Sequence, residues 1–212
     1  MQLYAQLSVI FTSFIFWFYI DSVSIFNNKR IINSALIHSI LLSISINLGY
    51  LFNPSIIYTF TFDEDVKQIY NFLGYISIGY SYYDLYIGIK SKQIDNIMHG
   101  GIFAISSSYL YINDNLFLTV ILLVTETSSI FLNLRPLQIK IIDILFVFSF
   151  FLYRLVFIPF VFVIYLTEPN NKDMLFAYTC SFTLTLLNMY WFYFIMKKAI
   201  RQIQSQPHPH SS

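Results

Sequence analysis

Seven long runs of mainly apolar residues constrain this chain more than any other feature of its sequence. A helix that crosses a bilayer needs roughly 20 such residues, and each run reaches or approaches that length. The runs cover residues 3–26, 31–52, 68–89, 96–112, 116–133, 141–166 and 174–196. Strands of a membrane barrel would instead show alternating segments of about 10 residues. We therefore predict an all-α membrane protein, a bundle of about seven transmembrane helices.

The fourth and fifth runs are the shortest, so a re-entrant hairpin is an alternative to two full crossings there. We expect residues 1–67 to hold two N-terminal transmembrane helices and a loop, and residues 68–201 to form the membrane core. The segment 202–212 is short, polar and contains proline, which predicts a disordered tail.

Composition excludes several classes of function. Only 11% of the 212 residues are charged, against about a quarter in soluble domains. The formal net charge is +1, so no strong field attracts nucleic acid, and we expect no nucleic-acid partner. Cys180 is the single cysteine, which excludes an internal disulfide and a cysteine-based metal site. We expect neither a metal nor a cofactor.

The distribution of basic residues predicts the orientation, because Lys and Arg collect in cytosolic loops. Alternate connections and the C-terminal end hold most of them: Lys29, Arg30, Lys90, Lys92, Arg135, Lys140, Lys197, Lys198 and Arg201. The opposite connections hold only Lys67 and Lys172. We predict a lumenal or external N-terminus and a cytosolic C-terminus.

The third to sixth apolar runs hold five acidic, basic or histidine residues: Asp84, His99, Glu126, Asp143 and Arg154. Each costs about 2.5–3.5 kcal/mol on insertion scales, so each is a candidate functional residue. Asp84, His99 and Glu126 occupy similar depths on successive helices and could face one cavity. The structural alternative is that Arg154 pairs with Asp84 or Glu126 to avoid a lone buried charge.

Helical spacing extends this set to a predicted polar cluster that lines a cavity. Its members are Asp84, Glu126, Ser129, Asn133, Arg154, Asn188 and Trp191. Polar side chains between membrane helices also serve packing alone, at about 0.6 kcal/mol each, and we expect that role for His38. Pro159 removes a backbone hydrogen bond from the sixth helix and should kink it.

Short motifs follow one another along the last five runs. They are Gly79-Tyr80-Ser81-Tyr82-Tyr83-Asp84-Leu85, then Ile97-Met98-His99-Gly100, then Glu126-Thr127-Ser128-Ser129-Ile130-Phe131-Leu132-Asn133-Leu134-Arg135, then Tyr153-Arg154 with Pro159, and Leu187-Asn188-Met189-Tyr190-Trp191-Phe192. Their order resembles the TLC-domain family, named for translocon-associated, longevity-assurance (ceramide synthase) and ceroid-lipofuscinosis membrane proteins. The Glu-x-Ser-x-x-Phe-x-Asn-x-Arg stretch is similar to the less characterised branch of that family. The resemblance spans residues 73–198. The amino-acid composition indicates an AT-rich genome, and giant-virus genomes are among the AT-rich sources that carry such proteins.

The resemblance implies a helical bundle around a lipid-accessible cavity, in the endoplasmic reticulum or another internal membrane. Family roles include acyl transfer to sphingoid bases, control of phospholipid composition and trafficking. Ceramide synthases present two adjacent histidines, whereas Gly100 follows His99 here.

Three functions are compatible with these features of the sequence. The first is a non-catalytic protein that binds or senses membrane lipid and influences lipid composition. The second is a lipid N-acyltransferase of ceramide-synthase type that uses His99 as its catalytic residue, because acyl transfer needs a base or a nucleophile. The third is a seven-helix receptor or channel. Membrane lipids are the expected partners, and homo-oligomerisation is left open.

Overall fold

The computed structural model describes residues 2–23, 33–54, 64–113, 122–167 and 174–204. These residues are helical almost throughout, and no strand occurs among them. The helices are α1 (Gln2–Ser22), α2 (Asn33–Phe52), α4 (Glu64–Ser91), α5 (Ile94–Ile112), α7 (Glu126–Leu134), α8 (Lys140–Phe150), α9 (Ile158–Thr167) and α10 (Met174–Gln204). Because α8 and α9 belong to one rod, seven helical rods result, and the predicted all-α bundle is confirmed.

Three of the described helical segments are long and apolar enough to cross a bilayer by length and composition alone. They are Leu3–Ser22, Asn33–Phe52 and Lys140–Ile164. A helix suits this environment because it satisfies its backbone polar groups within one segment. The remaining long helices carry more polar residues, and many of these lie at contacts with neighbouring helices.

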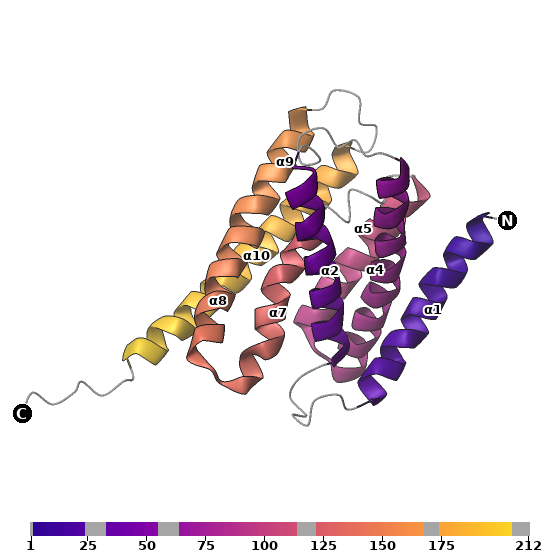
Figure 1. The fold of residues 1–212 in the computed structure, drawn as a ribbon. Helices are drawn as coiled ribbons and strands as arrows, with labels where there is room; N and C mark the ends of the chain where they lie inside the picture. Colours follow the sequence, from indigo (N-terminus) through magenta and orange to yellow (C-terminus); the bar gives the residue numbers. More distant parts are fainter. Residues whose placement is uncertain (1, 24–32, 55–63, 114–121, 168–173, 205–212) are drawn as a thin grey trace, which may run out of the picture.

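The helices are arranged side by side, with α1 at one edge of the bundle and α8, α9 and α10 at the other (Figure 1). Helix α1 packs on α4, α4 packs on α5, and α2 packs on α7, which in turn packs on α8. Helix α7 is short and lies inside this arrangement, with neighbours on two sides. Its polar residues are consequently placed between helices rather than against lipid.

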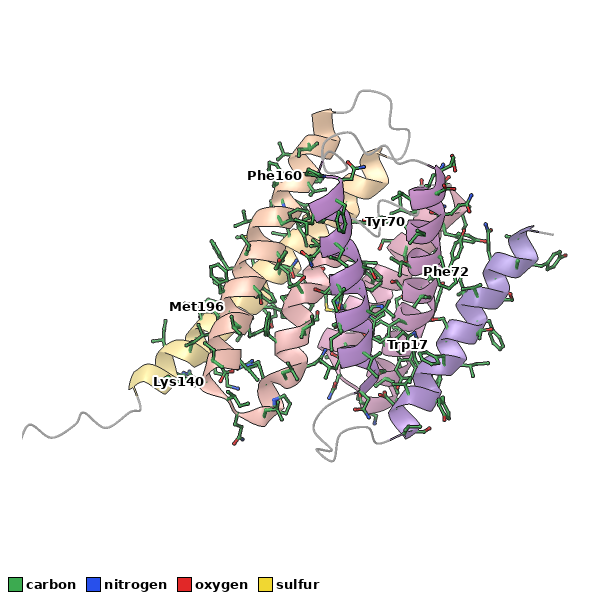
Figure 2. All side chains as sticks on the ribbon, viewed as in Figure 1. Trp17, Tyr70, Phe72, Lys140, Phe160 and Met196 are labelled. Carbon is green, nitrogen blue, oxygen red and sulfur yellow. The ribbon has the colours of Figure 1, made fainter. Side chains whose placement is uncertain are left out.

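Between its polar ends, the bundle carries many large apolar side chains on its outer surface (Figure 2). Large hydrophobic side chains on every long helix are well exposed, among them Phe11, Ile44, Phe72, Ile105, Phe148, Val163 and Phe182. A soluble monomer rarely exposes a contiguous apolar patch beyond a few hundred Å². This surface is therefore one that lipid tails cover.

Inside the bundle, α2, α4 and the 3-10 turn before α7 (Leu123–Thr125) share a packed cluster. It consists of Leu42, Ile46, Tyr70, Leu73, Leu123 and Val124. In a bilayer the hydrophobic effect does not drive these side chains together, because the surrounding acyl tails are equally apolar. Close packing and interhelical hydrogen bonds must hold the helices together instead.

Helices α1 and α4 approach most closely at Gly79. A Cβ atom there would lie 2.6 Å from the Ile10 carbonyl oxygen and 2.7 Å from the Ser13 Cβ. The Ser13 hydroxyl also donates a hydrogen bond of 2.9 Å to the Ile76 carbonyl of α4. A small residue that lets two backbones meet is the usual device of membrane helix contacts.

Asp21, near the end of α1, joins three helices. Its carboxylate accepts hydrogen bonds from the Ser34 backbone N–H at 2.8 Å and the Ser34 hydroxyl at 2.9 Å, at the start of α2. The Tyr83 hydroxyl of α4 donates a further hydrogen bond to it. Asp21 is not among the residues predicted from the sequence, because the sequence does not reveal which side chains an acid at the end of an apolar run contacts.

The sixth rod changes its helix type just before Pro159, where the sequence predicts a kink. Residues Phe151–Phe157 form a π-helix between α8 and α9. Pro159 has no N–H to give to the carbonyl four residues earlier, and a π-helix accommodates such a gap by shifting hydrogen bonds to i+5. Arg154 lies in this segment, and π-helical turns are frequent at functional sites.

Several boundaries differ from those predicted. Helix α4 begins at Glu64, ahead of the predicted domain boundary after residue 67, and α10 continues to Gln204, three residues into the predicted tail. The rest of that tail and the start of the fifth run, at residues 116–121, lie outside the described residues. Helix α10 keeps its register past the apolar run because Gln and Arg are good helix formers.

The basic residues that are described follow the predicted split between the two ends of the bundle. Helices α4, α7 and α10 end at the same end, near the start of α8, where Figure 2 labels Lys140. Lys29, Arg30 and Lys172 lie outside the described residues. Which end faces the cytosol stays a prediction from the positive-inside rule.

Candidate functional site

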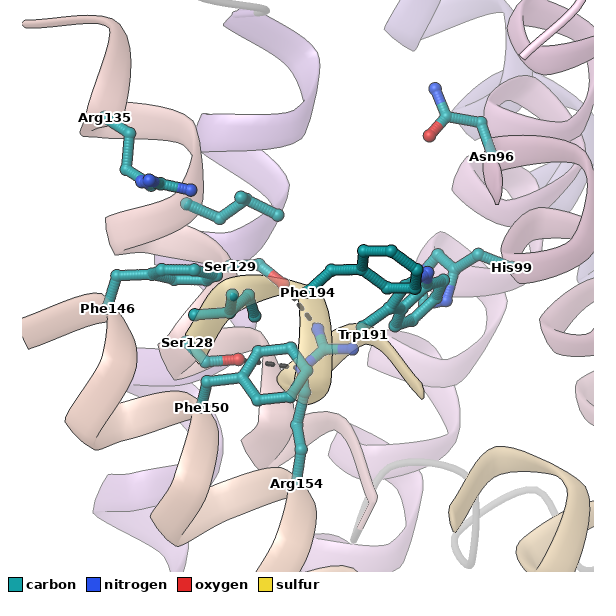
Figure 3. Close-up of a pocket in the computed structure, with 12 residues that line it drawn as sticks. Asn96, His99, Ser128, Ser129, Arg135, Phe146, Phe150, Arg154, Trp191 and Phe194 are labelled. Carbon is teal, nitrogen blue, oxygen red and sulfur yellow. Dashed lines mark hydrogen bonds between the residues drawn. The ribbon is translucent and has the colours of Figure 1, made fainter. Parts of the chain in front are cut away.

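A cavity of about 340 Å³ lies between α5, α7, the α8–π-helix rod and α10 (Figure 3). Its lining is Asn96, His99, Ser128, Ser129, Leu132, Arg135, Phe146, Phe150, Arg154, Trp191, Phe194 and Ile195. Aromatic and aliphatic side chains form most of the wall. Polar side chains make up six of the twelve lining residues and converge from α5, from α7 and the turn after it, and from the π-helix, and convergent polar groups in an apolar wall are typical of a small-molecule site.

Arg154 provides the main charge in this cavity and is almost completely buried, with 7% of its surface exposed. Its Nε donates to the Ser128 hydroxyl and one terminal nitrogen donates to the Ser129 hydroxyl, both at 2.8 Å. The guanidinium carbon lies 5.4 Å from the centroid of the Phe150 ring. These contacts hold the guanidinium in one orientation at the cavity wall (Figure 3).

The expected ion pair between Arg154 and Asp84 or Glu126 is wrong. Among the described residues, no carboxylate oxygen lies within 4.0 Å of an Arg154 nitrogen. The Glu126 carboxylate instead accepts a 2.8 Å hydrogen bond from Ser39 of α2 and lies 4.0 Å from the His38 Nδ1. Arg154 donates hydrogen bonds to two hydroxyl groups of α7, but among the described residues no carboxylate lies at contact distance.

The rotation of α7 explains this division. Successive residues of an α-helix are turned by about 100°, from 3.6 residues per turn, so Glu126 points roughly opposite to Ser128, and Thr127 points roughly opposite to Ser129. Thr127 accordingly contacts α2, where its hydroxyl lies 2.8 Å from that of Ser43. One polar run thus contacts α2 on one side and Arg154 on the other.

His38 lies in the contact between α2 and α4, outside the cavity lining. Its ring is stacked on Tyr80, with centroids 3.8 Å apart, and meets the edge of Trp17 at 5.5 Å. Only 1% of its surface is exposed, and neither ring nitrogen has a hydrogen-bond partner among the described residues. This geometry agrees with the packing role that we expect for His38.

His99 lies on the cavity wall near the start of α5. Its ring meets the edge of the Trp191 ring at a centroid distance of 5.7 Å, as Figure 3 shows. The His99 Nδ1 is buried and has no hydrogen-bond partner within the described part of the chain. No described acid is hydrogen-bonded to its ring.

A comparison with protein families decides what kind of bundle this is. A family model for the TLC domain matches residues 61–197. The chain belongs to the TLC-domain family. The predicted resemblance is thereby confirmed, and every residue that lines the cavity falls within the matched range. No curated protein and no solved structure matches the chain.

The TLC domain of this chain departs from the two-histidine pattern of ceramide synthases at Gly100, and the packing there is tight. A Cβ atom at Gly100 would lie 2.8 Å from the Leu85 backbone nitrogen and 3.2 Å from an Asp84 carboxylate oxygen. The neighbouring α4 backbone therefore occupies the space that a second histidine would need.

The structure divides the predicted polar cluster. Ser129, Arg154 and Trp191 line the cavity, together with the candidate catalytic His99. The other predicted members do not line it: Asp84, Glu126, Asn133 and Asn188. Each of these lies on a helix of the TLC domain, but the predicted stripes fixed only the spacing along a helix, not its rotation against its neighbours.

Asp143 and Arg135 form an ion pair at the α7–α8 turn, with 2.7 Å between the Arg135 Nε and a carboxylate oxygen. Asp143 was expected inside the sixth helix as a membrane-embedded acid. It lies in the first turn of α8. Its charge is neutralised by Arg135, which directly follows α7. Arg135 also lines the cavity, so the pair sits at one end of it.

The phenylalanines of the site were not predicted from the sequence, in contrast to Trp191. Phe146 and Phe150 line the cavity together with Arg154, and they are spaced i, i+4 and i+8 along one rod. A uniformly apolar run hides such a stripe, since inward and lipid-facing phenylalanines look alike. The spacing from Arg154 was the available signal.

Proposed function

We propose that this TLC-domain protein binds membrane lipid in the cavity and thereby influences membrane lipid composition, without catalysing a reaction on it. The observation that carries the proposal is the cavity itself, whose volume of about 340 Å³ falls in the range of small-molecule sites. It lies within a bundle whose outer surface is apolar. The endoplasmic reticulum or another internal membrane is the compartment that the family suggests.

Access for lipid supports the proposal. Leu132 and Phe194 line the cavity, and 45% and 47% of their surfaces are exposed. The cavity wall is therefore continuous with the surface that acyl tails cover. A lipid could move from the bilayer into the cavity without an apolar segment crossing water.

A non-catalytic role is supported by the packing at Gly100. Acyl transfer needs a group that removes a proton from an amine or carries the acyl chain. His99 is the one histidine of the described residues on the cavity wall, and the contact between Gly100 and Leu85 leaves no room for a second one beside it.

The test is the lipid composition of membranes that express the wild type, Leu132→Trp or Leu186→Trp. Leu132 lines the cavity, whereas Leu186 on α10 does not, and the two are similarly exposed, at 45% and 50%. We expect the wild type and Leu186→Trp to shift the acyl-chain distribution of phospholipids, and Leu132→Trp to resemble the empty control.

Two results would contradict the proposal. If all three folded proteins left the lipid profile unchanged, lipid handling would be refuted. If the wild type produced a new acylated species that His99→Ala abolished, the N-acyltransferase alternative would replace it.

A further inference from the structure

The cavity contains two arginines in very different electrostatic situations. Arg135 is paired with Asp143 at 2.7 Å. Arg154 is more deeply buried, and its only hydrogen-bond partners among the described residues are the neutral hydroxyls of Ser128 and Ser129. A buried cation is normally paired with an anion, and membrane-embedded charges follow the same rule.

Glu126 does not supply that anion at contact distance. It is close enough to Arg154 for a Coulombic interaction, but its carboxylate is hydrogen-bonded to Ser39 of α2. The charge of Arg154 is thus directed into the cavity, whereas the charge of Glu126 is directed toward α2.

We propose that the cavity takes the anionic phosphate or carboxylate of a membrane lipid, with the Arg154 guanidinium as its counter-charge. This inference rests on the proposed lipid-binding function and names the class of lipid. The serine contacts occupy two of the N–H groups of Arg154, and a guanidinium has five. The remaining donors suit an anionic oxygen group, which arginine binds with a planar fork.

The two ends of the cavity give this ligand a direction. Arg135 and Asn96 lie at one end, and Arg154 lies at the other (Figure 3). Six residues of helix separate Ser129 from Arg135, or about 9 Å at 1.5 Å per residue. The apolar wall of Phe146, Phe150 and Phe194 lies between these ends, where the first part of an acyl chain would pack.

The test measures binding to the purified full-length protein in nanodiscs, with native mass spectrometry as the readout. The probes are dioleoyl phosphatidic acid, oleic acid, dioleoyl phosphatidylcholine and inorganic phosphate. We expect the wild type to retain at least one of the two anionic lipids about tenfold more than phosphatidylcholine. Arg154→Gln should abolish this preference while phosphatidylcholine binding persists, and Arg154→Lys should keep part of it.

Arg201→Gln is the matched control, because it removes one positive charge from α10 away from the cavity lining and should keep the wild-type preference. If Arg154→Gln does not fold, the preference of the wild type alone decides. Equal retention of anionic and zwitterionic lipids would overturn this inference and leave lipid binding intact. Retention of no lipid would overturn both, and inorganic phosphate binding as tightly as phosphatidic acid would overturn the lipid as the source of the anion.

Discussion

Gly100 and Gly101 are adjacent on α5 but meet very different surroundings, and this contrast gives a sharp prediction. A Cβ atom at Gly100 would lie 2.8 Å from the Leu85 nitrogen and 3.1 Å from its Cα, both backbone atoms that cannot move alone. At Gly101 the nearest contact is a flexible Leu85 methyl group at 3.8 Å. Gly100→Ala should therefore push α5 from α4, and Gly101→Ala should not.

The magnitude follows from the comparison of the two variants. Both gain helix propensity, about 1 kcal/mol for Gly to Ala, and this gain cancels between them. Overpacking costs about 1–3 kcal/mol, which should appear as the difference in free energy of unfolding. At about 2–4 °C per kcal/mol for a chain of this size, Gly100→Ala should melt roughly 2–12 °C below Gly101→Ala.

The assay is thermal unfolding of both purified variants in the same detergent, followed by the loss of helical circular dichroism. Equal melting temperatures would show that α4 and α5 do not meet at Gly100. The steric argument against a second histidine would then fail with it.

Substitutions at three further positions test the polar contacts between helices. Asp21→Ala should lower the free energy of unfolding by about 2 kcal/mol or more, since hydrogen bonds to charged groups contribute about 1.5–3 kcal/mol; denaturant titration in detergent measures this, and a loss below about 0.5 kcal/mol would contradict it. Glu126→Ala should cost about 1.5–3 kcal/mol, whereas Glu126→Gln, which keeps an acceptor for Ser39, should cost clearly less, and equal losses in differential scanning calorimetry would refute the role of that bond. Asp143→Asn should cost at most about 1 kcal/mol, because its pair with Arg135 is partly exposed and such pairs are weak; a larger cost in the same scan would mean that the pair is more buried than described.

Much of the fold could be predicted because membrane helices are specified by length and apolarity alone. The runs at residues 31–52 and 141–166 correspond closely to α2 and to the α8–α9 rod. The ends were harder to predict, because polar residues can extend a helix beyond the bilayer. Helix α10, which continues to Gln204, illustrates this.

The candidate site was predictable only in part, since sequence spacing does not fix how a helix is rotated. Glu126 and Ser129 were expected on one cavity wall, but α7 turns Glu126 toward Ser39 and Ser129 toward Arg154. The predicted ion pair between Arg154 and Asp84 or Glu126 is wrong for the same reason. Asp21 could not be recognised, because its partners Ser34 and Tyr83 come from helices whose approach the sequence does not reveal.

The central claim is that a membrane lipid occupies the cavity between α5, α7, the α8–π-helix rod and α10. Native mass spectrometry of the protein extracted mildly from its own membrane tests it most directly. We predict one retained lipid per chain for the wild type and for Leu186→Trp, and loss of that lipid in Leu132→Trp. Retention in all three proteins, or in none, would contradict the account.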